Sequence, residues 1–404
     1  MKKIKENIAI ITLYWDNNNY GGLLQAYALT KFLNSKNYNA KQISFRRDFF
    51  YPRSKLTRFI DNIKNYGLFK SLFLKIFFTL RQLKHKNLAN FNKLIKHRNK
   101  SFQKFRLSIP HTDKEYYKDT ITAIPNVDTY ICGSDQIWSF DKNLFNEAFW
   151  LNFVKAKKKI AYAAGPSINY KNKKQLKYFY NNTKDFSAIS FREKQALITS
   201  SNENIYIKHL QKNSITVLDP VFLLTKNDWN EVCAPKIDSN PCACVFLYSK
   251  SKKYRQSIKD YCSKNKLKII NFPYLENYRN KNDENFGDTD IYEGPETLLS
   301  CIKNSEIIFT DSFHILAFSI IFNKPVVIFR RTTKFPFFHT NNKRMENLLN
   351  IFTSDVTFID ENSNAKIIEN VLKHPVCIDE SSYFNKMDKL KKYSMKFLTN
   401  ALNK

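Results

Sequence analysis

Residues 307–329 read IIFTDSFHILAFSIIFNKPVVIF, and this stretch indicates the fold of the chain. An apolar strand at 307–310 is followed by a polar step, an apolar helix around 315–322 and a second apolar strand at 325–329. In open α/β sheets, ligands bind at the carboxyl ends of strands, where helix N-terminal amides point at the site. His314 lies at this step, which makes it the first catalytic candidate.

The same alternation of strands and helices runs through the rest of the sequence. The further predicted elements are strands at 8–13, 41–45, 129–132, 159–163, 188–191, 215–218, 244–248, 267–270 and 356–359, with helices at 22–36 and near 171–183. A chain of 404 residues is also longer than one hydrophobic core usually organises. We therefore expect an α/β fold with two Rossmann-like parallel-sheet domains facing a cleft.

The domain boundary is expected in the polar, proline-containing stretch at about 225–241. This places an N-terminal domain at 1–230 and a C-terminal domain, ending in helices, at 231–404. A basic helical insertion at about 46–110 interrupts the first domain.

Composition and cysteine use exclude several classes of protein. Hydrophobic content of 43% rules out wholesale disorder. The seven cysteines include no CxxC pair, so we expect no metal site and a reducing, cytoplasmic compartment. The apolar run at 8–13 has no small-residue cleavage site after it, so we interpret it as a first strand and not as a signal peptide. No apolar stretch approaches the ~20 residues of a membrane-spanning helix.

Positive charge is concentrated in one segment. Between residues 41 and 106 there are 18 Lys or Arg and two Asp, interleaved with aromatic and aliphatic residues in stretches of roughly helical spacing. A basic amphipathic helix would bind an anionic membrane surface through residues 46–106. A helical insertion that packs on its own domain explains the composition equally well. No recognition motif accompanies the charge, so a nucleic-acid partner is not expected.

Two polar motifs follow predicted strands of the first domain. Residues 19–25 read NYGGLLQ, and their glycines allow backbone N–H groups to approach an anion or a sugar. Residues 133–138 read GSDQIW and group a carboxylate, an amide and an aromatic face, which suit a saccharide. A helix N-cap with a buried tryptophan explains the second motif equally well. The acceptor-binding candidates are Asn19, Tyr20, Gly21, Gly22, Gln25, Ser134, Gln136 and Trp138.

Two arginines have comparable positions. Arg192 ends the predicted strand at 188–191 and is able to fork onto a carboxylate or phosphate. Arg344 begins a helical pattern at 343–349. Taken singly, Arg192 is better explained as a surface arginine that caps a strand, and Arg344 fits the solvated face of a helix.

The ordered set of motifs resembles the polysaccharide pyruvyl transferase family. The set is NYGG-x-LQAYAL at 19–29, GSDQ-x-W at 133–138, IAYAA at 160–164, REK at 192–194, LDP at 218–220, TDSFH at 310–314 and R-x-x-x-LL at 344–349. The resemblance covers about residues 8–352. It implies a fold like the two-domain GT-B glycosyltransferases, with the acceptor on the N-terminal domain and phosphoenolpyruvate as donor on the C-terminal domain. The implied product is a pyruvate ketal on a cell-surface glycan or its lipid-linked precursor.

The resemblance also implies roles for individual residues. His314 matches the histidine of the family's donor site, and Arg192 matches an arginine placed near phosphoenolpyruvate. We hypothesise that His314 transfers the proton, that Asp135 orients or deprotonates a sugar hydroxyl, and that Trp138 stacks on the sugar ring. No cofactor is implied beyond phosphoenolpyruvate as co-substrate.

The chain departs from the family at one position. Some members have Arg-Leu-His where this sequence has Ser312, Phe313 and His314, so one guanidinium is missing. The donor anions must then be held by other groups, and the candidates are Arg344, Lys324 and the Ser312 hydroxyl beside Phe313.

Two other functions fit the same sequence. A GT-B glycosyltransferase would bind a nucleotide sugar in preference to phosphoenolpyruvate. A non-enzymatic glycan-binding or membrane-surface scaffold would depend on the basic segment and not on His314. For each of these functions we expect a cytoplasmic protein, with peripheral attachment at the inner face of the membrane if the basic segment binds lipid.

Overall fold

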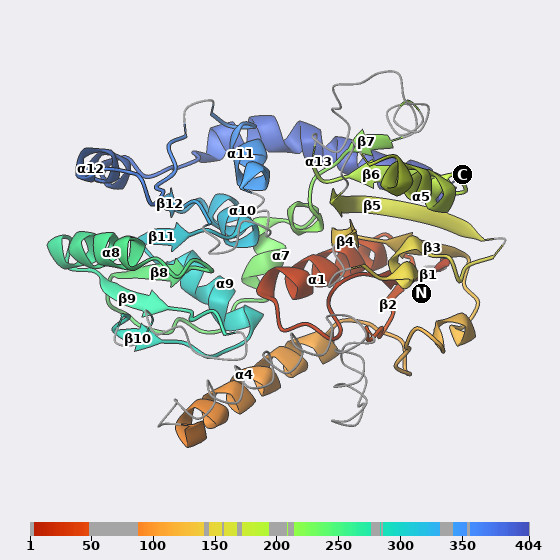
Figure 1. The fold of residues 1–404 in the computed structure, drawn as a ribbon, viewed down its shortest axis with the longest axis horizontal. Helices are drawn as coiled ribbons and strands as arrows, with labels where there is room; N and C mark the ends of the chain where they lie inside the picture. The colour runs from red at the N-terminus through yellow and green to blue at the C-terminus, as the bar shows by residue number, and fades with distance from the viewer. Residues whose placement is uncertain are drawn as a thin grey trace.

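The computed structural model describes residues 4–47, 88–140, 145–155, 157–167, 172–193, 208, 214–275, 283, 286–331, 342–353 and 356–403. Its strands form two parallel sheets, one from the N-terminal half of the chain and one from the C-terminal half (Figure 1). The expected α/β fold of two Rossmann-like parallel-sheet domains is confirmed.

The first sheet has the strand order β2-β1-β3-β5-β6-β7, and β4 pairs with β5. Its strands are β1 (Asn7–Ile11), β2 (Asn39–Gln42), β3 (Thr129–Cys132), β4 (Asp135–Ser139), β5 (Lys158–Ser167), β6 (Ala188–Phe191) and β7 (Ser214–Thr216). Six of the seven lie at predicted strands. β4 was not predicted, because its sequence DQIWS mixes polar and apolar residues without the apolar run of its neighbours.

The second sheet has the strand order β10-β9-β8-β11-β12. Its strands are β8 (Cys242–Phe246), β9 (Lys268–Asn271), β10 (Thr289–Asp290), β11 (Ile307–Thr310) and β12 (Val326–Ile328). Residues 307–329 form β11, α10 and β12, as expected. The strand predicted at 356–359 is wrong, because only Ile359 pairs there, in an isolated bridge to Phe329.

Helices cover the faces of both sheets and fill the space between them (Figure 1). The longer described helices are α1 (Tyr20–Ser35), α4 (Leu88–Ser108), α5 (Lys173–Thr183), α7 (Lys226–Asn230), α8 (Lys252–Lys264), α9 (Pro295–Asn304), α10 (Phe313–Ile321), α11 (Lys343–Leu349), α12 (Ala365–Lys373) and α13 (Glu380–Asn403). The short 3-10 helices are η2 (Ile121–Ala123), η3 (Glu147–Trp150) and η5 (Pro220–Phe222).

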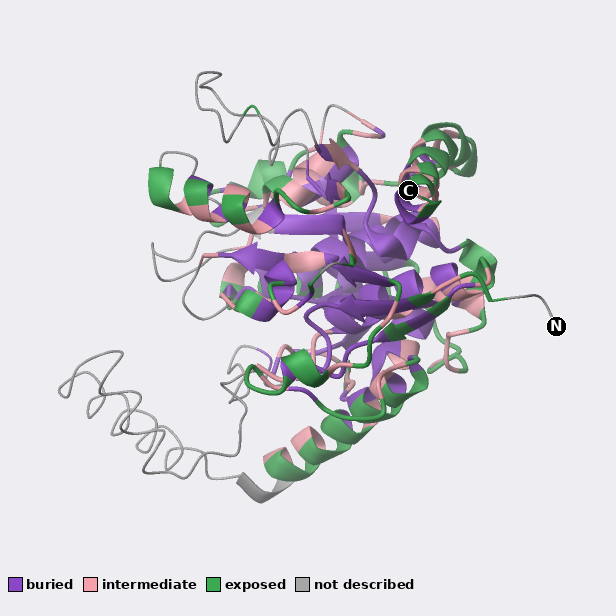
Figure 2. Cartoon of the chain, turned by 90° about the vertical axis from the view of Figure 1, so that its right-hand side faces the viewer, coloured by how far each residue is buried: buried purple, intermediate pink, exposed green. Residues whose placement is uncertain are grey.

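One hydrophobic core is continuous across the two domains. It joins Leu24 of α1 to Leu299 of α9 and Leu316 of α10, all completely buried. Figure 2 shows the buried residues concentrated in the strands and in the helices between the sheets. The carboxyl ends of the strands in both sheets are therefore held facing each other by packing, and loops from both domains meet there.

The described end of the basic segment, α4, packs on protein. Phe102 of α4 is completely buried against Tyr20, and Arg106 donates hydrogen bonds to the carbonyls of Tyr14 and Asn17. Across the junction, Ser101 donates a hydrogen bond to Glu293 of the second domain (2.5 Å). The apolar side of α4 is thus used between the two domains. The rest of the proposed membrane contact, residues 48–87, lies outside the described residues, and that contact stays a prediction.

Helix α13 also contacts both domains (Figure 1). Near its start, Tyr383 stacks on Phe352 of the second domain. Further along, the Ser394 hydroxyl accepts a hydrogen bond from the Leu218 N–H (3.0 Å), and Phe397 contacts Tyr162 of the first sheet. A helix that the sequence assigned to the second domain therefore covers part of the first.

Replacing Ser394 by Ala tests this contact. Ser394 is completely buried, so the variant leaves the Leu218 N–H without its acceptor inside the protein. We expect the free energy of unfolding to fall by about 1–3 kcal/mol, measured by urea denaturation. The matched control is Lys392→Ala on the exposed face of α13, where loss of the pair with Asp388 costs at most about 0.5 kcal/mol. Equal losses for the two variants would contradict the buried contact.

Candidate active site

His314 lies in the first turn of α10, at the junction of the two domains. Its imidazole is buried, and Nε2 lies 3.6 Å from the Asp219 carboxylate of the first domain. The other side of the ring lies against Gly21 of α1, where an added Cβ would be 2.0 Å from Nδ1. Glycine is required at position 21 because no other residue leaves room for the imidazole.

Asp219 is the residue that connects the other groups of the site. It follows β7 and is completely buried, and its carboxylate accepts hydrogen bonds from Arg192 Nη1 (2.9 Å) and Ser134 Oγ (3.3 Å). Burial raises the pKa of the Asp219 carboxyl, but His314 and Arg192 outweigh burial and hold this pKa well below its usual range. The carboxylate is therefore ionised at neutral pH.

Arg192 lies at the carboxyl end of β6 and is held by carboxylates. Its Nε donates to Glu193 (2.9 Å), Nη1 donates to Asp219, and Nη2 lies 3.9 Å from Asp135 Oδ1. Burial lowers the pKa of the guanidinium, but these carboxylates raise it further, so the net direction is upward. The guanidinium also lies over the ring of Phe313, 4.8 Å from its centroid. Nη2 is buried without a hydrogen-bond partner in the described part of the chain.

Two further arginines from the second domain lie beside this group. Arg344 comes from α11, and Arg331 comes shortly after β12. Burial, and next the like charge of Arg192, lower the pKa of Arg344 to about 10, and Arg331 acts in the same direction. Arg344 Nε is buried and has no hydrogen-bond partner among the described residues. We call His314, Asp219, Arg192, Asp135 and Arg344 the interdomain cluster.

Asp135 lies in the cluster and has an unusual backbone conformation. Its φ is 72°, a left-handed value that is uncommon outside glycine and recurs at functional sites. Gly133, two residues earlier, has a φ of 112°. It lies so close to the Tyr162 carbonyl that a Cβ would be 2.2 Å from the oxygen. The turn after β3 is thereby pressed onto β5, which directs Asp135 toward Arg192.

Several predicted acceptor residues instead hold the backbone around the cluster. Gln25 donates to Thr12 Oγ1 and accepts from the Ser134 N–H, which ties α1 to the turn after β3. Asn19 caps α1 through the Gly22 N–H. Gly22 lies against the Leu13 carbonyl, Tyr20 packs in the interdomain core, and Gln136 is half-buried beside Asp135.

The predicted stacking of Trp138 on a sugar ring is wrong. Trp138 is completely buried in the first domain, where its ring stacks on Trp150 (5.3 Å between centroids) and meets the edge of Phe179. Its Nε1 donates to the Phe149 carbonyl (3.0 Å). The aromatic face is therefore covered by protein and cannot contact a substrate.

The three remaining donor candidates differ in position. Phe313 is close to the cluster because it lies beneath Arg192, and Ser312 is the N-cap residue of α10. Lys324 follows α10 and precedes β12, where Glu306 is near. Lys324 therefore lies at the amino-terminal edge of the second sheet and not at the cluster. We do not assign it as a donor ligand.

Asp219 belongs to the LDP motif at 218–220, but the sequence alone indicated no role for it. Its position directly after a strand and before Pro220 was the available signal. Arg331 was missed altogether.

The family of the chain follows from its sequence. Residues 19–332, which include every member of the cluster except Arg344, match the family described as polysaccharide pyruvyl transferase. This chain belongs to that family. Membership of this family supports a transferase and implies a polysaccharide acceptor. None of the curated proteins matches the sequence.

The solved structures similar to this chain have low sequence identity. The UDP-N-acetylglucosamine 2-epimerase of Rickettsia bellii is 9% identical, with a TM-score of 0.49, over 98% of this chain and 96% of that one. The UDP-GlcNAc 2-epimerase of Neisseria meningitidis is 14% identical, with a TM-score of 0.46, over 98% and 99%. A mutant of S. aureus TarM, in complex with UDP and other ligands, is 12% identical, with a TM-score of 0.46, over 99% and 100%.

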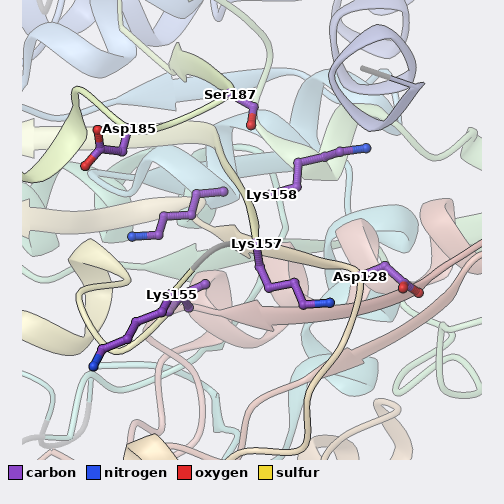
Figure 3. Close-up of a pocket in the computed structure, with 8 residues that line it drawn as sticks. Asp128, Lys155, Lys157, Lys158, Asp185 and Ser187 are labelled. Atoms are coloured by element: carbon purple, nitrogen blue, oxygen red, sulfur yellow. The ribbon is translucent and has the colours of Figure 1, made fainter.

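A hollow lies away from the cluster, at the amino-terminal edge of the first sheet (Figure 3). It has a volume of about 800 Å³ and is lined by Asp128, Val154, Lys155, Lys157, Lys158, Lys159, Asp185 and Ser187. Lys158 already contacts Glu6 and the Leu402 carbonyl. In Figure 3 the labelled lysines extend in different directions and do not converge, so we assign no ligand to this hollow.

Two further properties concern only the part of the chain that the structure describes. In these residues no helix has both the length and the apolar character needed to span a membrane. The same residues contain no group of three His, Cys, Asp or Glu side chains suited to a metal ion.

Replacing Gly21 by Ala tests the contact with His314. The added methyl group displaces the imidazole, so we expect Gly21→Ala to lower the free energy of unfolding in the wild-type background. The loss should shrink when His314 is already Ala, because the ring is gone. Urea denaturation of the two single variants, the double variant and the wild type gives this coupling energy. Equal losses in both backgrounds would contradict the contact.

Replacing Trp138 tests its reassignment to the core. We expect Trp138→Ala to lower the free energy of unfolding by about 3–5 kcal/mol, since it leaves a large cavity. Trp138→Phe keeps most of the apolar contact and should cost clearly less. Chemical denaturation measures both, and a Trp138→Ala variant as stable as the wild type would contradict the buried position.

Proposed function

We propose that the protein transfers a pyruvyl group from phosphoenolpyruvate to two hydroxyls of a saccharide and forms a pyruvate ketal. The main support is the interdomain cluster, in which His314 lies beside Asp219 and Arg192 with Arg344 nearby. The reaction needs a proton donor and cations for a phosphate and a carboxylate. The cluster contains both kinds of group.

In the first step His314 protonates the methylene carbon of phosphoenolpyruvate, which makes C2 electrophilic. Nε2 is the nitrogen we assign to this transfer, because it has no hydrogen-bond partner among the described residues and lies 3.6 Å from Asp219. The ionised Asp219 carboxylate faces Nε2 and fixes the orientation of the imidazole. Asp219 therefore acts as a positioning residue for the acid.

In the second step a sugar hydroxyl adds to C2 and gives its proton to Asp135. Phosphate then leaves with the C2–O bond electrons, and a second hydroxyl adds to the same carbon. Overall, one methyl group and two C–O bonds form, and one C–O bond breaks. Of the two hydroxyl protons, one replaces the proton given by His314 and the other leaves with phosphate.

The donor anions are bound by arginines in this proposal. Arg192 contributes Nη2, since its other nitrogens are engaged by carboxylates, and Arg344 contributes a guanidinium with a buried free Nε. Bidentate arginine contacts suit both a carboxylate and a phosphate. The Ser312 hydroxyl at the start of α10 is a further donor to the same space.

For the acceptor we propose a polymeric or lipid-linked glycan, bound on the first-domain side of the cluster. We assign Asp135 to the acceptor because it lies on the first-domain side of Arg192, while the turn at 133–134 and the start of α1 shape the backbone around it. A lipid-linked acceptor would bring the protein to the inner face of the membrane.

Two histidine variants test the mechanism. His314→Ala should reduce turnover about 100- to 10,000-fold, the usual contribution of a general acid. Turnover is measured as phosphate release from phosphoenolpyruvate in the presence of a glycan acceptor. The control is His374→Ala, at the exposed end of α12, which should keep wild-type turnover. Near-normal turnover of His314→Ala would remove the histidine from the mechanism.

The donor itself is tested by calorimetric titration of the wild-type protein. We expect phosphoenolpyruvate to bind in preference to UDP- and GDP-sugars. Selective binding of a nucleotide sugar would overturn the proposed donor and favour a glycosyltransferase.

A further inference from the structure

Arg331 has contacts that suit an anion ligand and were not foreseen from the sequence. It follows Arg330 just after β12, at the carboxyl end of the second sheet. Its Nη2 donates a hydrogen bond to the backbone carbonyl of Asp311 (3.0 Å). The guanidinium also lies on the face of Tyr248, 3.9 Å from the ring centroid. These two contacts fix the group beside the first turn of α10.

The charge of Arg331 is not used in an ion pair with any described residue. The carboxylate of Asp311 accepts hydrogen bonds from the N–H groups of Tyr248 and Ser249 and from the Ser249 hydroxyl. The adjacent Arg330 shows the contrast, because it forms an ion pair with Glu346 (2.7 Å). Two neighbouring arginines therefore have different roles: one is compensated by a carboxylate and the other is not.

Arg331 also adds positive charge to a place that already holds two arginines. Arg344 is close enough to both Arg192 and Arg331 for their charges to act on it. Guanidinium groups gathered in this way repel each other, and an anion bound among them removes the repulsion. Arg192 is engaged by Glu193 and Asp219 and keeps Nη2 for a ligand, so Arg331 and Arg344 supply most of the uncompensated positive charge among the described residues here.

We propose that Arg331 binds an anionic group of the donor together with Arg344. The inference rests on the proposed function and adds the residue that supplies the guanidinium absent from position 312. The position is suitable because Arg331 donates to the carbonyl of Asp311, the residue directly before Ser312. The donor class that fits is a small molecule with two separate anionic groups, such as the phosphate and carboxylate of phosphoenolpyruvate.

Calorimetric titration with phosphoenolpyruvate tests the assignment in the full-length protein. Arg331→Ala should weaken binding about ten- to a hundredfold, as expected for loss of a charge-assisted contact. The matched control is Arg330→Ala, which removes an equal charge one residue away and should change binding less than about twofold, because that charge is already compensated by Glu346. Adding Ser312→Arg to Arg331→Ala should restore much of the lost affinity, because the new guanidinium starts from the neighbouring position.

The outcomes separate this inference from the proposed function. If the wild type binds phosphoenolpyruvate and Arg331→Ala binds it equally well, the assignment is overturned and the function stands. The assignment also fails if Arg330→Ala weakens binding as much as Arg331→Ala. If the wild type itself binds no phosphoenolpyruvate, the proposed function fails and the assignment fails with it. A purely structural role for Arg331 would not be rescued by Ser312→Arg.

Discussion

The buried carboxylate of Asp219 is the interaction on which the site depends. It lies in the first domain, yet it faces the imidazole of His314 from the second, and it bonds Arg192 and Ser134 as well. A fully buried charge is tolerated only where opposite charges and hydrogen bonds compensate it. Asp219 therefore requires both domains to be in contact, and the contact in turn sets the orientation of His314. Structure and chemistry are coupled through one carboxyl group.

The two long helices α4 and α13 stabilise this contact from opposite sides of the molecule. Helix α4 joins the loop after β1 to Glu293, and α13 joins Phe352 to Leu218. Three separate sets of contacts therefore hold the junction: those of α4, those of α13 and the continuous hydrophobic core. The arginines and the histidine are thus held in register before any substrate binds, which is what electrostatic catalysis needs.

The sequence predicted the strands well, since apolar runs such as 307–310 and 129–132 belong to buried parallel strands. It also marked His314, Arg192 and Arg344, because each belongs to one of the ordered motifs. The sequence did not predict the surroundings of a side chain where residues distant in the chain form them. Trp138 is covered by Trp150 and Phe179, and nothing in its own motif indicates this burial. Likewise, Arg330 and Arg331 are identical in chemistry, and only the positions of Glu346 and Asp311 distinguish them.

The path of α13 has a consequence for how the protein is made. Strands β1 to β7 leave the ribosome well before α13, yet Leu218 and Tyr162 of the first domain need Ser394 and Phe397 as neighbours. Domains generally fold as units, N-terminal first, during synthesis. Here the first domain waits with one apolar side uncovered until the whole second domain has been synthesised. Transiently exposed apolar surface of this kind favours aggregation.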